Sequence, residues 1–171
     1  WYSEDTGNLI NEAPTEFKEK GVKGVILDVR NNPGGLLSGA VQVSEQWLQT
    51  GNVILEVKRD SQVIKTYKAN SRGVLAGVPT VILVNEGSAS ASEITAGALK
   101  DNDVATLVGV TTFGKGSVQE PIQYSDGSLL KVTVARWFTP NGQNIDEEGI
   151  EPDVKVERTE DDYKNDKDPQ L

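Results

Sequence analysis

Three serines in a short stretch of small residues are the clearest candidates for chemistry in this sequence. Ser88, Ser90 and Ser92 alternate with alanines inside VILVNEGSASASE, residues 81–93. The apolar start of this stretch predicts a buried strand, and NEG predicts a turn before a helix that begins near Glu93. Such a junction can present a nucleophile beside free backbone N–H groups. The alternative is that each serine only caps the helix, which serine does well.

The absence of histidine and cysteine restricts the chemistry of any catalytic serine. Without histidine there is no Ser-His-Asp triad and no imidazole metal ligand. Without cysteine there is no thiol nucleophile, disulfide or thiolate metal site. A catalytic serine must therefore use a lysine, a carboxylate or an N-terminal amine as its base. We expect neither a metal nor a cofactor.

Lys115 is the best candidate for that base. It lies between Gly114 and Gly116 in TTFGKGSVQ, residues 111–119, which holds no other charge. Neighbouring backbone can approach such a lysine closely, and withdrawal from water favours a neutral amine because desolvation disfavours the ammonium. A neutral amine can take the proton of a serine hydroxyl. The alternative is a solvated surface lysine, the usual state of this residue type.

A second glycine-rich loop, RNNPGG at residues 30–35, follows a predicted buried strand at 22–29 and precedes a predicted helix at 36–48. Ligand sites of α/β folds lie at the carboxyl ends of such strands. Gly34 and Gly35 can direct backbone N–H groups into a site without obstruction by side chains. The alternative is an ordinary strand-to-helix turn, since the loop contains no phosphate-binding signature.

Strands alternating with helices predict an α/β domain. The runs 53–57 and 63–67 predict a hairpin, and the alternating run 129–138 predicts a late strand, so we expect a mixed central β-sheet flanked by helices. A chain of 171 residues suffices for one domain. We expect a core at residues 1–156 and a charged, flexible tail at 157–171.

The charge balance limits the partners of this chain. A net charge of −9 argues against nucleic acid or an anionic membrane. No apolar run approaches the roughly 18 residues of a membrane span. The sequence contains no methionine, even at position 1. We therefore expect a piece of a longer protein, with any targeting segment outside it.

Three stretches together resemble the C-terminal processing (tail-specific) proteases, a family of serine proteases. They are GVILDVRNNPGGLL, NEGSASASEITAGALKD and TTFGKGSVQ. The similarity extends from Phe17 to Val156 and includes ARWFTPNGQNIDEEGIEPDV. The resemblance implies a ClpP/crotonase-like core and a Ser-Lys dyad. It implies an endopeptidase that cleaves unstructured C-terminal segments of proteins through an acyl-enzyme.

By this resemblance, Ser90 is the nucleophile, Lys115 is the general base and Gln119 orients the base. Asp101 matches an acidic position of the family as an accessory residue, for which a structural role is the alternative. The remaining assignments concern the backbone and the turn. The oxyanion hole would use the N–H group of Ala91 and that of either Gly34 or Gly35. Turn and helix-cap roles are assigned to Ser88, Ser92 and Glu93.

The resemblance also implies partners and a location. Polypeptide substrates would bind as an added strand near the site. A PDZ domain is expected elsewhere in the full-length protein, a homo-oligomer is allowed, and the expected location is extracytoplasmic: periplasmic, secreted or envelope-anchored.

Two other readings use the same fold. One is a non-catalytic module that binds peptides or apolar ligands, and the other is crotonase-like acyl-CoA chemistry. Ser90, Lys115 and Gln119 together favour the protease, because a binding module has no need for all three.

Overall fold

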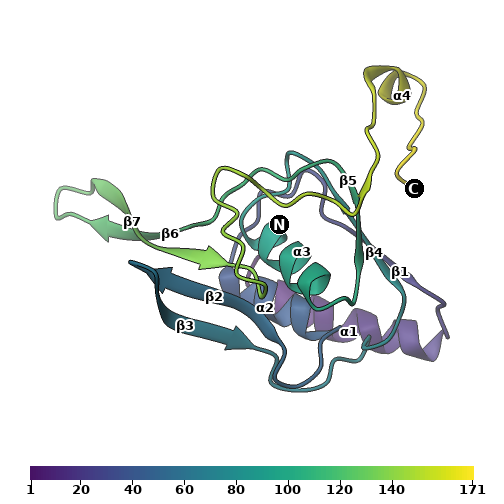
Figure 1. Ribbon diagram of the computed structural model, residues 1–171, viewed down its shortest axis with the longest axis horizontal. Helices are drawn as coiled ribbons and strands as arrows, with labels where there is room; N and C mark the ends of the chain where they lie inside the picture. The colour runs from purple at the N-terminus through teal and green to yellow at the C-terminus, as the bar shows by residue number, and fades with distance from the viewer.

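The computed structural model describes residues 1–171 apart from the side chain of Lys18. The chain so described contains four helices and eight strands (Figure 1), and helices separate the strands only in its first part. The elements are, in order, α1 (Thr6–Glu19), β1 (Val25–Asp28), α2 (Leu37–Glu45), β2 (Val53–Arg59), β3 (Gln62–Lys68), β4 (Thr80–Val84), α3 (Ala91–Asp101), β5 (Thr106–Gly109), β6 (Ser117–Gln123), β7 (Leu129–Phe138), β8 (Val154–Lys155) and α4 (Glu160–Lys164). Among the described residues, no helix combines the length and the apolar character that crossing a bilayer requires.

The strands form two four-stranded sheets, and the predicted α/β class is confirmed. The first sheet has the order β1-β4-β5-β8, and all its neighbouring strands are parallel. The second has the order β3-β2-β7-β6, and all its neighbours are antiparallel. The mixture of parallel and antiparallel strands expected from the sequence is thus divided between two sheets.

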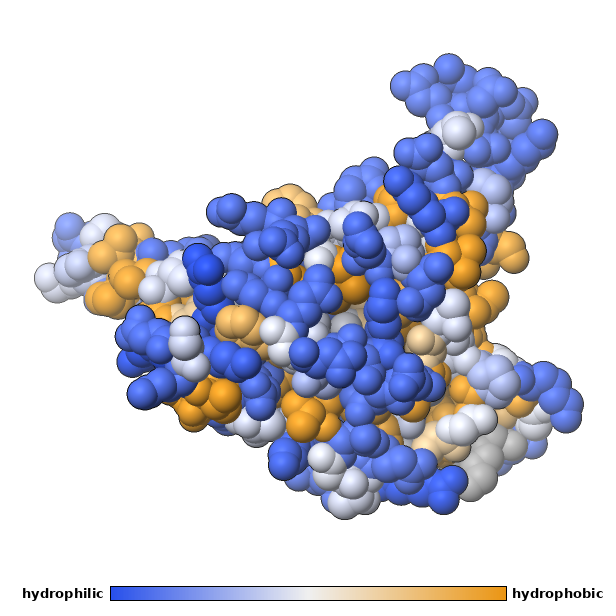
Figure 2. Space-filling model, viewed as in Figure 1, coloured by the Kyte–Doolittle hydropathy of each residue, from blue (hydrophilic) through white to orange (hydrophobic). Residues whose placement is uncertain are grey.

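Strands β6 and β7 form a hairpin that projects from the body of the molecule (Figure 1). The sequence predicted β7 but not β6. The outer part of this hairpin is exposed on both faces. Apolar and polar residues therefore do not alternate along β6, and the sequence does not predict a strand there. The apolar side chains of the hairpin include Ile122 of β6 and Leu129 and Leu130 of β7, all of them exposed. Figure 2 shows apolar residues among polar ones along this projection.

Helix α3 joins the two sheets, because it contacts β2 of the antiparallel sheet and β5 of the parallel sheet. It also packs against α2. Every residue from Ala91 to Leu99 is buried, and most of them are small. A Cβ atom added at Gly97 would lie 3.0 Å from Thr139 Cγ2, so neighbours approach this helix closely. The helix is therefore a fixed support for the residue before it, Ser90.

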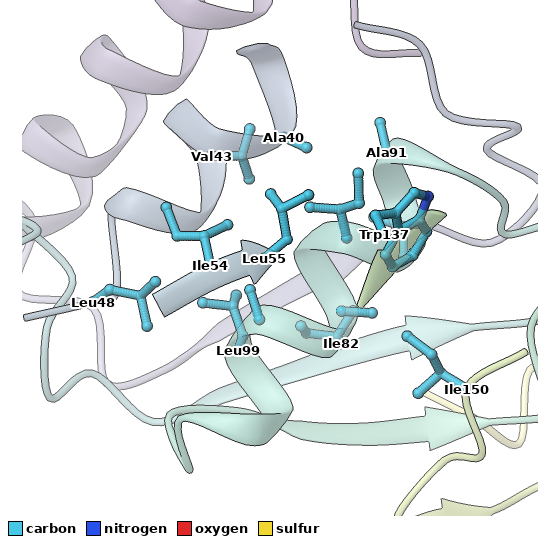
Figure 3. Packing of buried hydrophobic residues seen from close by; sticks show 14 of the residues in the cluster. Ala40, Val43, Leu48, Ile54, Leu55, Ile82, Ala91, Leu99, Trp137 and Ile150 are labelled. Atoms are coloured by element: carbon cyan, nitrogen blue, oxygen red, sulfur yellow. The ribbon is translucent and has the colours of Figure 1, made fainter. Parts of the chain in front are cut away.

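The hydrophobic core lies around α3 (Figure 3). Leu55 of β2 and Ile82 of β4 are buried near Leu99 of the helix. Trp47 is also buried, and its indole Nε1 donates a hydrogen bond to Thr80 Oγ1 at 2.7 Å. This bond satisfies the one polar atom of the indole inside the core.

Residues 157–171 form an extension that contains α4 and stands apart from the body (Figure 1). Beyond α4, Asp168 and Gln170 return to the body and bind the side chain of Arg30. The domain boundary at residue 156 and the flexibility of the tail stay predictions.

Tyr2 links the start of the chain to α3 and has an unusual titration. Its hydroxyl donates to Thr95 Oγ1 at 3.0 Å, and the side chain is only 4% exposed. Burial raises the pKa of Tyr2 to about 12, because a buried phenolate loses its hydration; hydrogen bonds with Thr95 and Ser92 oppose this effect. The native protein therefore holds the Tyr2 proton more tightly than the unfolded chain does.

Tyr2 should make the protein lose stability in alkali. Between its unfolded pKa near 10 and its native pKa near 12, the unfolded state releases the proton first. The free energy of unfolding should therefore be nearly insensitive to Tyr2 below pH 10 and fall as the pH rises through 12, by about 2.7 kcal/mol in total. Urea unfolding across this range measures the fall. In Tyr2→Phe this fall in the free energy of unfolding should be absent. In the control Tyr163→Phe, at an exposed tyrosine, it should be unchanged. The same dependence on pH in both variants would contradict the prediction.

Candidate active site

Ser90 lies between β4 and α3, at the strand–turn–helix junction that the sequence predicted. It directly precedes the helix, with φ 54° and ψ −115°. This combination of φ and ψ lies outside the regions that residues with a side chain usually occupy, costs on the order of 1–3 kcal/mol, and belongs to the strained conformations that cluster at functional sites. Ser88 and Ser92 do not share this conformation. The backbone therefore distinguishes Ser90 from its two neighbours.

The N-cap of the helix is Ser90, so the cap part of the prediction for Ser88 and Ser92 is wrong, whereas Ser88 does have the predicted turn role. The Ser88 hydroxyl donates to the carbonyl of Val29 at 2.8 Å and accepts from Asn85 N at 3.0 Å. The Ser92 hydroxyl donates to the carbonyl of Asn32 at 2.9 Å. Both side chains tie the serine turn to the loop after β1, a contact that local sequence cannot reveal.

The loop at residues 30–35 lies against the serine turn because β1 and β4 are parallel neighbours. Ala89 N donates to the carbonyl of Asn32 at 3.0 Å. Gly34 is so close that an added Cβ atom would lie 2.8 Å from Ser90 Cβ, and its φ is 97°. Both the space and the backbone conformation therefore require glycine at this position.

Two backbone N–H groups near Ser90, those of Gly35 and Ala91, donate to no protein acceptor within the described part of the chain. The Gly34 N–H group, by contrast, donates to Asn32 Oδ1 at 3.0 Å. Ala91 begins α3, where N–H groups lack partners inside the helix. Of the two glycines, Gly35 thus has the N–H group that is free to stabilise an oxyanion.

Lys115 is exposed, so its side chain is not withdrawn from water in this conformation. The glycines on either side offer no side chains that could cover it. Within the described residues, its amine makes no hydrogen bond with Ser90. Its backbone nevertheless lies at the site, since Lys115 N donates to Glu93 Oε2 at 3.0 Å.

Glu93 joins the backbones of the two predicted catalytic residues. Its side chain is fully buried, and both carboxylate oxygens accept two hydrogen bonds. Oε2 accepts from Ser90 N at 2.8 Å and from Lys115 N at 3.0 Å. Oε1 accepts from Thr112 Oγ1 at 2.6 Å and from Gly114 N at 2.7 Å. One carboxylate therefore fixes the serine turn relative to the lysine loop.

The sequence predicted only a cap role for Glu93. The spacing Ser-x-x-Glu does indicate its bond to the N–H group of Ser90, as in a capping box. Its other bonds reach residues 112–115, about twenty positions further along the chain. No local sequence pattern predicts those contacts. A buried carboxylate beside a nucleophile can be recognised only in the folded chain.

A cavity of about 210 Å³ opens beside Ser90 and brings several predicted residues together. Ser90, Ala91, Gly35 and Gln119 all line it, whereas Lys115 does not. The rest of the lining is mostly apolar and comes from Leu37, Leu55, Val57, Ile94, Val118 and Trp137. Figure 3 shows Leu55, Ala91 and Trp137 close together on this side of the core. The site can therefore accept an apolar side chain next to the serine.

Asp101 is not brought to this cavity. It is the last of the 11 residues of α3, whereas Ser90 precedes the first, which separates them by roughly 16 Å along the helix. The Asp101 carboxylate accepts from Asn141 N at 2.9 Å and lines a separate, larger hollow. This contact supports the structural alternative. Among the described residues, no group of three or more His, Cys, Asp or Glu side chains could hold a metal ion.

A serine at positive φ before a helix, beside free backbone N–H groups and an apolar cavity, is typical of a serine hydrolase. The comparison with protein families agrees with this class. The chain belongs to peptidase family S41, whose model matches residues 1–156.

Known relatives confirm the resemblance to C-terminal processing proteases. The chain is similar to the carboxy-terminal processing protease CtpA of Bacillus subtilis (strain 168), with 43% identity over 156 residues, covering 91% of this chain and 33% of the relative. It is 42% identical over 157 residues to the chloroplastic C-terminal processing peptidase of Tetradesmus obliquus, with the same coverage.

A solved structure gives the same result for the fold. The photosystem II D1 C-terminal processing protease matches with a TM-score of 0.86 at 39% identity, over 91% of this chain and 40% of that one. The chain spans about a third of the length of the curated relatives.

Proposed function

We propose that this chain forms the catalytic part of a serine endopeptidase, with Ser90 as the nucleophile and Lys115 as the general base. The observation that carries the proposal is the position of Ser90 at an apolar cavity beside the free N–H groups of Gly35 and Ala91. The hydroxyls of the other two serines in the turn already donate to backbone carbonyls. This supports Ser90 as the residue that reacts.

In the proposed mechanism, Ser90 Oγ attacks the scissile carbonyl carbon while its proton passes to Lys115 Nζ. The resulting oxyanion accepts hydrogen bonds from Gly35 N and Ala91 N, each worth roughly 3–4 kcal/mol in comparable sites. Lys115 then returns the proton to the leaving amine as the C–N bond breaks. Water hydrolyses the acyl-enzyme by the same steps. The side-chain oxygen of Gln119 can accept from the lysine and so orient it.

The Lys115 side chain must turn from solvent toward Ser90 for this step. Glu93 already ties Lys115 N and Ser90 N to one carboxylate oxygen, which keeps the two backbones close together. Rotation about the single bonds of the flexible lysine side chain can then move Nζ toward the serine turn.

Strand β6 supports the proposed mode of substrate binding. It is an edge strand of the antiparallel sheet, and its residues 117–119 line the cavity beside Ser90. A free edge offers unpaired N–H and C=O groups, to which an extended peptide can add as a further strand. We propose that the unstructured C-terminal segment of a protein binds there. The names of the relatives, which describe C-terminal processing, support this substrate class.

The expected PDZ domain, the homo-oligomer and the extracytoplasmic location remain part of this proposal. One relative is named as chloroplastic.

The alternative of a non-catalytic peptide-binding module is favoured by one observation. The Lys115 side chain is exposed, and it does not line the cavity with Ser90. The labelling and cleavage experiment below separates the two functions.

The apolar cavity should decide which residue precedes the cleaved bond. Val57→Phe would fill much of this cavity, so kcat/KM for cleavage after leucine should fall at least about tenfold relative to cleavage after alanine. Two peptides that differ only at this position measure the ratio. Val63→Phe, at an exposed position of β3, is the matched control. The same ratio in both variants would assign substrate selection to another part of the chain.

The proposal is tested by labelling and by cleavage. A fluorophosphonate, which forms a covalent bond with activated serines, should label the chain once, and mass spectrometry of the labelled peptide should place the bond on Ser90. The unlabelled chain should cleave a permanently unfolded protein, and the labelled chain should not. Labelling at Ser88 or Ser92, or cleavage that survives complete labelling, would overturn the assignment of Ser90. Binding of the unfolded protein with neither labelling nor cleavage would establish the binding module instead.

A further inference from the structure

Arg30 connects the loop at residues 30–35 with the far end of the chain. On one side, Arg30 Nη2 donates to Asp28 Oδ2 at 2.7 Å. On the other side, Arg30 Nη1 donates to Asp168 Oδ2 at 2.8 Å and to Gln170 Oε1 at 2.7 Å. The side chains of Arg30 and Asp168 are only 13% and 18% exposed. This ion pair is therefore better shielded from solvent than an ordinary surface pair.

Gln170 attaches the same segment to the opposite side of the parallel sheet. Its Nε2 donates to the carbonyl of Val156 at 2.7 Å. Val156 N donates to the carbonyl of Gly109 at 2.9 Å, which continues the pairing of β8 with β5. Since β1 and β8 are the two outer strands, the segment from Asp168 to Gln170 bridges both edges of the sheet.

The loop held by Arg30 ends at Gly35, the proposed oxyanion donor. Between them, Asn31 N donates to Asn85 Oδ1 at 2.8 Å, and the carbonyl of Asn32 accepts from the serine turn. The first residue of the loop is thus anchored by the end of the chain, and its middle is anchored by the turn that carries Ser90. Both anchors restrict where the N–H group of Gly35 can lie.

We propose that Asp168 and Gln170 are positioning residues for the oxyanion hole, because they hold Arg30 and through it the loop that presents Gly35. This inference rests on the proposed function of that loop. A misplacement of about 1 Å in a catalytic group can cost on the order of 100-fold in rate. Activity should therefore depend on whether the segment from Asp168 to Gln170 is seated on Arg30.

Amide hydrogen exchange tests the structural coupling without any need for activity. In Asp168→Ala, the amides of Asn31, Gly34 and Ala89 should exchange at least about tenfold faster than in the unchanged chain, while the amides of β4 keep their rates. Asp161→Ala is the matched control, because it removes the same charge from the exposed helix α4. Equal rates in the two variants would overturn the inference. If Asp168→Ala does not fold, Asp168→Asn, which keeps the shape and loses the charge, replaces it.

A peptide boronic acid tests the consequence for the site. Ser90 Oγ adds to its boron atom, the hydroxyl proton passes to the base, and a boron-bound oxygen occupies the oxyanion hole. Asp168→Ala should weaken this binding about 10- to 100-fold and leave the affinity for an uncleaved peptide unchanged. Equal loss for both ligands would show general damage and overturn the positioning role. If even the unchanged chain binds no boronic acid, the proposed function fails, while the exchange rates still decide whether the coupling exists.

Discussion

Replacing Lys115 by alanine should abolish cleavage and leave the fold intact. Without a base to take the proton of Ser90, kcat should fall at least about 1,000-fold. The side chain is exposed, so the free energy of unfolding should change by less than about 0.5 kcal/mol. Cleavage of an unfolded protein and urea unfolding measure the two quantities. Ser90→Ala should be inactive to at least the same degree.

Two variants make this prediction specific to proton transfer. Lys115→Arg keeps the positive charge, but a guanidinium does not give up its proton in proteins, so this variant should be as inactive as Lys115→Ala. Lys131→Ala, at an exposed position of β7, should keep full activity. Activity of Lys115→Ala or Lys115→Arg within tenfold of the unchanged chain would remove Lys115 as the general base.

Replacing Glu93 should damage both stability and activity. Glu93→Ala leaves Thr112 Oγ1 and three backbone N–H groups without their buried acceptor, at a cost of about 1–3 kcal/mol for each group that water cannot reach. Because some of these groups can turn to water or to other acceptors, we expect a total loss of about 3–5 kcal/mol in the free energy of unfolding. Glu93→Gln keeps the shape but turns an NH₂ group toward donors, so it should lose about 2–3 kcal/mol. Urea unfolding measures both losses.

The effect of Glu93→Gln on the folded enzyme should be larger than stability alone explains. Because one carboxylate oxygen holds Ser90 N and Lys115 N together, kcat should fall about 100-fold at a temperature where the variant is fully folded. KM should change little, since Glu93 does not line the cavity. Glu12→Gln, at an exposed position of α1, is the matched control. Equal kcat values for the two variants would reduce Glu93 to a structural residue.

Much of the fold could be predicted because its elements have strong local patterns. Local sequence patterns predict the strand in the apolar run 81–84, the hairpin of β2 and β3, and the alternating strand β7. They do not predict strand β6, because its outer part faces solvent on both sides and Pro121 lies in its middle. It forms because β7 provides a partner for its backbone. Tertiary pairing, rather than its own composition, makes this segment a strand.

The residue types of the site could be predicted from the sequence, but the hydrogen bonds that join its segments could not. The small-residue turn indicated a nucleophile, and the lack of histidine directed attention to Lys115. The roles of Ser88 and Ser92 depend on the loop after β1, about sixty positions earlier in the chain. The anchor of Arg30 lies further still, at Asp168. Spacing in one sequence carries no information about such contacts.

The strained backbone conformation of Ser90 lowers the stability of the folded protein. Glycine would adopt φ 54° and ψ −115° without opposition from a Cβ atom, yet the chain has a serine there. A chain optimised for stability alone would have no reason to keep a side chain at this position. If Ser90 is the nucleophile we propose, the serine marks a trade-off, in which the folded state gives up part of its stability to hold the hydroxyl at the site.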